Sequence, residues 1–147
     1  MNGLLGGMVA TCSGVNVYDS WAAILVGIFG AWGFYIQVWL FEYYFHIDDP
    51  LNASALHQGS GIVGMLFVGF FANDKYVGGD MDKAGIFFGG NGKQLGYQMY
   101  GVLVYFAWAF GTSMLLFGAL RAMGWLRVSR EVELMGMGKF LAANLRQ

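Results

Sequence analysis

Charged residues divide the chain into long uncharged stretches. Residues 1–18, 20–41, 50–73 and 94–120 contain no Asp, Glu, Lys or Arg, and the last three run for 22, 24 and 27 residues. A helix needs about 20 apolar residues to cross the ~30 Å hydrocarbon core of a bilayer. The pattern therefore predicts membrane-spanning helices near residues 20–45, 52–72 and 94–123, and a partial helix within residues 1–18.

Composition excludes the main alternative, a soluble bundle of buried helices. Hydrophobic residues make up 57% of the chain and charged residues 12%, whereas soluble domains carry about 25% charged residues. The 24 glycines and single proline suit helices that pack backbone to backbone in lipid. The net charge of −1 gives no sign of a nucleic-acid partner, and the single cysteine, Cys12, allows no intrachain disulfide. We therefore expect an all-α integral membrane protein.

Basic residues suggest an orientation. Three arginines flank the end of the last predicted span, at positions 121, 127 and 130. Cytoplasmic ends of membrane helices are enriched in Lys and Arg, so the tail is predicted to be cytoplasmic and the loop 73–93 external. Three lysines in that loop, at positions 75, 83 and 93, count against this orientation.

The chemistry that stands out lies at the start of the third uncharged stretch. Asp49 followed by Pro50 is typical of a helix N-cap and the first helical position. His57 would then lie eight residues into the helix, ~12 Å from the cap and near the middle of the bilayer. At regular helical spacing, one face would carry Ser54, His57, Gly61 and Gly64.

Two interpretations of His57 remain open from the residues alone. An ionisable side chain deep in a membrane is costly, so it is expected to face a pore or cavity, or to be hydrogen-bonded to a neighbouring helix for structural reasons. His46, Asp48, Asp49 and His57 match no common metal-site spacing, and no nucleophile stands beside a base. No cofactor or resident metal is predicted.

The same segment resembles a known family. The run Asp48-Asp49-Pro50, followed by His57 and the glycines at 59, 61 and 64, resembles the penultimate helix of Amt/Mep/Rh ammonium transporters. Gln58 stands where that family often has Gly. Residues 70–76 and 89–95 are similar to the plant-type Amt branch, and residues 126–129 and 133–137 resemble the start of its cytoplasmic tail.

The resemblance implies a fold and a function. The family fold has eleven helices in two inverted repeats, assembles as homotrimers and contains one pore per subunit. This chain resembles the C-terminal part, with residues 1–125 in the membrane domain and residues 126–147 in the tail. Ammonium or ammonia is the implied substrate, the plasma membrane the implied location, and no enzymatic activity is implied.

The resemblance also implies roles for single residues. His57 matches the second of two facing pore histidines, and Asp49 the acidic residue of the same repeat, with Ser54, Gly61 and Gly64 supporting the pore. The other histidine matches nothing in this chain, so we expect no conduction by the chain alone. At the tail, Gly138 replaces a common Asp, and residues 139–147 contain no Ser, Thr or Tyr, which makes regulation by phosphorylation there doubtful.

Two other classes of function stay open at this point. The chain could be a structural or regulatory membrane subunit that does not transport but assembles with complete transporters. Less favoured is a small membrane-embedded metalloenzyme that uses Asp48, Asp49 and His57. It would need a metal or a second catalytic partner, and the sequence offers no loop rich in ligands.

Overall fold

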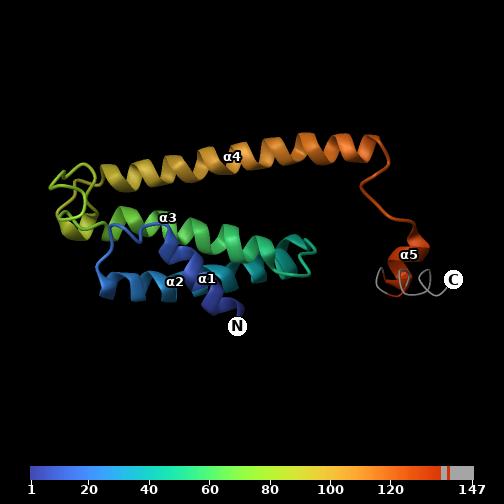
Figure 1. Cartoon of the computed structure of the whole chain (residues 1–147), viewed down its shortest axis with the longest axis horizontal. Coiled ribbons are helices and arrows are strands. Elements are labelled where there is room, and N and C mark those ends of the chain that lie inside the picture. The colour runs from blue at the N-terminus through green and yellow to red at the C-terminus, as the bar shows by residue number, and fades with distance from the viewer. Residues whose placement is uncertain (137–138, 140–147) are drawn as a thin grey trace. The chain divides into compact units, whose positions relative to one another are not determined.

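The computed structural model describes residues 1–136 and residue 139, and this part contains helices and no strand (Figure 1). The expected departures at Gly138 and beyond Lys139 lie outside the described residues. The chain divides into two compact units, Met1–Val104 and Tyr105–Gln147. The elements, in chain order, are α1 (Asn2–Cys12), α2 (Ser20–Trp39), η1 (Leu40–Phe45), η2 (Ala55–Gly59), α3 (Ser60–Phe71), η3 (Ile86–Phe88), α4 (Lys93–Ala122) and α5 (Arg130–Met135).

Helices occupy each stretch that lacks charge. The π-helical η1 extends α2, so that one continuous helix runs over Ser20–Phe45, and α4 runs over Lys93–Ala122. These helices, of 26 and 30 residues, are long and apolar enough to cross a bilayer. The third, Ala55–Phe71, is shorter. Two further helical residues, Ala53 and Ser54, precede Ala55, so the helical backbone begins at Ala53.

The start of this third helix corrects one prediction. Pro50 is not the first helical residue, because the backbone N–H of Asn52 donates to the carbonyl of Asp49 (2.9 Å) and closes a turn. Pro50 fits the second position of such a turn, and Asn52 has φ 52°, a left-handed conformation that Asn tolerates. His57 therefore lies five residues after Asn52, the residue before the helix, or about 7.5 Å along the axis rather than the predicted ~12 Å.

Helices α1, α2 and α3 pack together through small residues. A Cβ on Gly7 would lie 2.7 Å from the carbonyl oxygen of Gly27, and one on Gly30 would lie 2.3 Å from the Cβ of Ala10. Residues larger than Gly would force these backbones apart. Close backbone approach of this kind is how helices associate in lipid, where there is no hydrophobic force between them.

Polar contacts tie the loop between α1 and α2 to the end of α3. The buried Asn73 donates from Nδ2 to Asp19 (2.6 Å), and its backbone N–H donates to the carbonyl of Val17 (2.9 Å). The hydroxyl of Tyr18 donates to the carbonyl of Gly64 (3.2 Å). Burial raises the pKa of the Tyr18 phenol.

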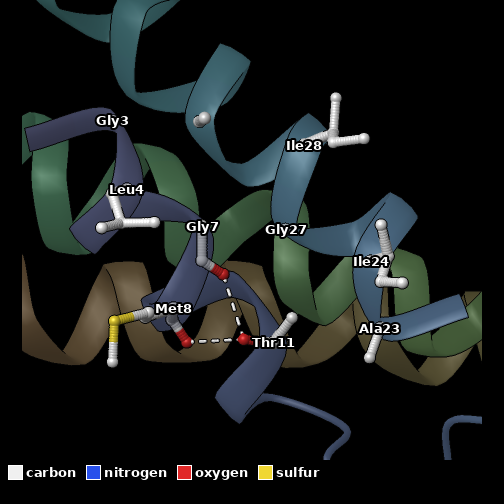
Figure 2. Close-up of a pocket in the computed structure, with 10 residues that line it drawn as sticks. Gly3, Leu4, Gly7, Met8, Thr11, Ala23, Ile24, Gly27 and Ile28 are labelled. Atoms are coloured by element: carbon white, nitrogen blue, oxygen red, sulfur yellow. Dashed lines mark hydrogen bonds between the residues drawn. The ribbon is translucent and has the colours of Figure 1, made fainter. Parts of the chain in front are cut away.

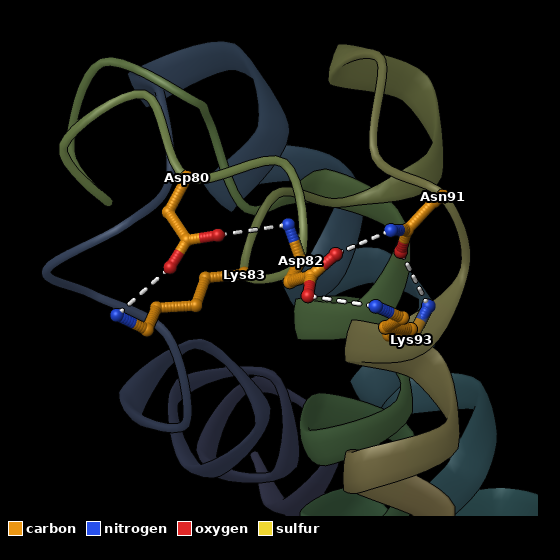
Figure 3. Close-up of polar contacts among 5 residues, drawn as sticks. All are labelled: Asp80, Asp82, Lys83, Asn91 and Lys93. Atoms are coloured by element: carbon orange, nitrogen blue, oxygen red, sulfur yellow. Dashed lines mark hydrogen bonds and ion pairs between the residues drawn. The ribbon is translucent and has the colours of Figure 1, made fainter.

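Aspartates pair with two of the three lysines in the loop 73–93 (Figure 3). Lys83 contacts Asp80 (3.0 Å), and Lys93, the first residue of α4, contacts Asp82 (2.8 Å). Hydrogen bonds from Lys93 and then Asn91 hold the pKa of Asp82 below its usual value. These pairs are exposed, so their main effect is to shape the loop rather than to add stability.

Much of the chain's apolar surface is exposed. Helix α4 has no buried residue, and Leu115 on it is 77% exposed. On α2, Trp32 and Tyr35 are each 60% exposed. Water-soluble proteins rarely show apolar patches of this extent, so these surfaces suit lipid or further protein.

The small-residue contacts predict a stability difference between two glycines. Gly30→Ala places a Cβ against Ala10, whereas nothing lies within 4 Å of a Cβ at Gly111. We expect Gly30→Ala to lower the free energy of unfolding by about 1–3 kcal/mol, the usual cost of overpacking. Unfolding of the purified chain by SDS in mixed micelles, followed by circular dichroism, measures the difference. Equal stability of Gly30→Ala and Gly111→Ala would contradict the described packing.

Candidate functional site

His57 lies at the centre of a π-helical turn. This turn, η2, covers Ala55–Gly59, directly before α3. The imidazole is exposed, and within the described residues no hydrogen bond joins it to another side chain or to the backbone. π turns are rare and occur often at functional sites. His57 is therefore an exposed ionisable side chain on a π-helical turn.

Asp49 fixes the start of the helix that carries His57. Its Oδ1 accepts a hydrogen bond from the backbone N–H of Ala53 (3.1 Å), and its Oδ2 accepts one from that of Ser54 (2.9 Å). A carboxylate at this end also favours the positive end of the helix dipole. Capping by Asp49 was the prediction, and it is achieved from across the turn rather than from the N-cap position.

Ser54 belongs to a polar cluster that the sequence prediction missed. Nε2 of Gln37, on α2, donates to Oγ of Ser54 (2.9 Å) and to Oε1 of Gln58 (3.1 Å). The Ser54 hydroxyl donates to the same Oε1 (3.0 Å). The signal was present in the sequence, since an amide in an uncharged span is costly unless it finds a partner.

The predicted shared face of Ser54, His57, Gly61 and Gly64 is wrong. A Cβ on Gly64 would lie 2.3 Å from the carbonyl oxygen of Ala10, so Gly64 packs against α1. Nothing lies within 4 Å of a Cβ on Gly61, which leaves the space on that side open. The π turn uses more residues per turn than an α-helix, so regular spacing does not carry from Ser54 into α3. Gly61 and Gly64 both lie in α3, where a separation of three residues turns them about 60° apart. His57 and Gly61 are exposed or half-buried, whereas Ser54 bonds to α2 and Gly64 is buried.

The exposed His57 imidazole suits proton exchange better than metal binding. Imidazole is the side chain that most readily gains and loses a proton near neutral pH. Within the described residues, no three His, Cys, Asp or Glu side chains gather as a metal site would require. The metalloenzyme interpretation therefore gains no support from the geometry.

An apolar groove lies elsewhere, between α1 and α2 (Figure 2). Its volume is about 540 Å³, and its lining includes Leu4, Met8, Ile24 and Ile28. The hydroxyl of Thr11, also in the lining, donates to backbone carbonyls of its own helix. The groove thus offers an apolar surface and no group for acid–base chemistry.

Comparison with known proteins gives a consistent result. The model of the Ammonium Transporter Family matches residues 1–143. The chain is 42% identical over 139 residues to Ammonium transporter 1 member 1 of Oryza sativa subsp. japonica, covering 92% of this chain and 28% of that protein. It is 41% identical over 143 residues to Ammonium transporter 1 member 2 of Arabidopsis thaliana, covering 92% and 27%.

A third relative has a similar identity and coverage. Ammonium transporter 1 member 1 of Solanum lycopersicum is 40% identical over 144 residues, which cover 92% of this chain and 29% of that protein. The chain thus spans less than a third of the length of these relatives. The plant-type resemblance read from residues 70–76 and 89–95 is confirmed, as is the all-helical membrane fold. By the family match over nearly its whole length and by these relatives, the chain belongs to the ammonium transporter family.

Proposed function

We propose that the protein containing this chain moves ammonium or ammonia across a membrane, and that His57 lies on the conduction path. The observation that carries the proposal is the exposed imidazole on a π turn in a member of this family, four residues before Gly61, whose Cβ position faces open space. A structural histidine would be expected to bond to a neighbouring helix, and within the described residues the ring makes no such bond.

The physical need for such a group is clear. NH4⁺ loses its hydration free energy on entering an apolar path. Without polar groups that replace the lost water, this cost prevents the ion from crossing. An imidazole can take the proton and return it, so that neutral ammonia and the proton cross separately. His57 is the ionisable residue of helix Ala55–Phe71 and therefore the candidate for this exchange.

The other predicted site residues act by support. Asp49 caps the helix, and Ser54 joins it to α2 through Gln37. The Cβ position of Gly61 faces open space, and Gly64 allows α1 to approach closely. Each of these roles sets where the imidazole lies.

The wider setting is also proposed. Residues 1–125 would form part of the membrane domain and residues 126–147 a cytoplasmic tail, in a homotrimer in the plasma membrane without enzymatic activity. This chain would supply one wall of the conduction path. Further helices must supply the opposing wall before the protein can conduct. A structural or regulatory membrane subunit that assembles with complete transporters is the second candidate.

Loss of His57 should abolish electrogenic transport. The assay uses a chimaera in which this chain replaces the matched segment of the Arabidopsis relative, expressed in oocytes. We expect His57→Ala to reduce the ammonium current about 100-fold, since proton transfer by a positioned side chain contributes on that order. His57→Glu should be milder because a carboxyl group also exchanges protons.

His46→Ala is the matched control, because His46 is the other histidine, lies at the end of η1 and is exposed. Unchanged current and selectivity in His57→Ala would refute the pore role.

Growth on low ammonium separates the two candidate functions. A transporter-deficient yeast should grow with the chimaera and fail to grow with the chain alone, and growth with the chain alone would refute its need for an opposing wall.

Topology is tested with single cysteines. Cys12 is the only cysteine, so Cys12→Ser gives a background without thiols. We expect Gly78→Cys, in the loop 73–93, to react with an impermeant maleimide on intact cells. Ser129→Cys, before α5, should react only after the cells are opened. Labelling of position 129 from outside would reverse the orientation.

A further inference from the structure

A buried amide on the neighbouring helix holds both ends of the π turn. Gln37 is 8% exposed and bonds to Ser54, which directly precedes Ala55, and to Gln58, which lies inside the turn beside His57. We propose that Gln37 is a positioning residue that fixes the π turn and thereby the direction of the His57 side chain. Its consequence for transport rests on the function proposed above.

The cluster is closed on itself. Gln37 donates to Ser54 and Gln58, and Ser54 donates to Gln58, so each of the three side chains bonds to the other two. In a membrane interior such bonds have no water to compete with them, and an unpaired amide there would be costly. The cluster therefore favours the one backbone arrangement that brings Ser54 and Gln58 within reach of Gln37.

The π turn needs such an external contact. A π turn has one residue more than the α-helical turn it replaces, and it persists where its surroundings stabilise it. If the π turn became regular α-helix, the residues before it would rotate by about 100° about the helix axis relative to the residues after it. Such a rotation would turn His57 away from its present direction.

A backbone contact on the same face of α2 supports the amide. A Cβ on Gly59 would lie 2.8 Å from the carbonyl oxygen of Gly33 and 3.0 Å from Oε1 of Gln37. Gly33 and Gln37 are one helical turn apart on α2 and together cover the turn Ala55–Gly59. His57 lies on the uncovered side, so α2 can set its direction without touching it.

The two histidines give a direct spectroscopic test. The full chain, labelled with ¹³C,¹⁵N-histidine and placed in lipid nanodiscs, should give NMR signals from His46 and His57 alone. Gln37→Met keeps the length of the side chain and removes the amide. We expect it to move the backbone and ring signals of His57 and to leave those of His46 in place. Gln98→Met, on α4, is the matched control and should move neither.

Hydrogen exchange gives a second readout. Amide exchange across residues 55–59 should quicken about tenfold in Gln37→Met, because the turn opens locally. Ser54→Ala removes a smaller part of the cluster and should shift the His57 signals in the same direction by less. The double variant should shift them no further than Gln37→Met does, because both changes act through one cluster.

The outcomes separate the two proposals. Unmoved His57 signals in both Gln37→Met and Ser54→Ala would overturn the positioning role. If Gln37→Met moves both histidines and lowers helix content, Ser54→Ala decides, and a shift confined to His57 is required. If the His57 signals move as expected but His57→Ala leaves the ammonium current of the chimaera unchanged, the positioning role stands and the transport role of His57 fails.

Discussion

Backbone contact between α2 and η2 at Gly33 and Gly59 is the constraint on which the rest of the site depends. A Cβ at either position would lie within 3 Å of the facing carbonyl oxygen, so a residue larger than Gly would force the two backbones apart. Lipid provides no hydrophobic force between helices, and packing and hydrogen bonds must hold them together. That short separation brings the Gln37 amide within reach of Ser54 and Gln58, and it leaves α3 with one packed side and one open side.

The two sides of α3 have different tasks. The packed side carries Ser60, whose hydroxyl donates to the carbonyl of Gly30 (3.0 Å), and Gly64 against α1. The open side carries Gly61, and His57 is exposed in η2, directly before α3. An ionisable group is costly in a membrane unless it faces a cavity or a partner. Under the function proposed above, a polar substrate would pass along this open side.

The sequence predicted the parts of this structure that depend on local composition. Charges are expensive in lipid, so the stretches between Asp19 and Glu42 and between Lys93 and Arg121 had to mark helices. The turn at Asn52 had a local signal in Pro50 and Asn52, but the pair Asp49-Pro50 also fits a helix start. The π turn at Ala55–Gly59 was not predictable, because its polar contact is with Gln37 on another helix. The predicted face of Ser54, His57, Gly61 and Gly64 assumed regular α-helical spacing through that turn. The Gln37 cluster could have been suspected from a lone amide within an apolar span.

Accessibility of the open side tests the central claim most directly. In the chimaera with Cys12→Ser and no other reactive thiol, Gly61→Cys places a thiol beside His57, and Val68→Cys places one at a position that is 6% exposed. If the open side of α3 lines the path, a small charged methanethiosulfonate reagent should block the ammonium current of Gly61→Cys, excess ammonium should slow that block, and Val68→Cys should keep its current. A current in Gly61→Cys that survives the reagent, with modification of the thiol confirmed by mass spectrometry, would contradict the account.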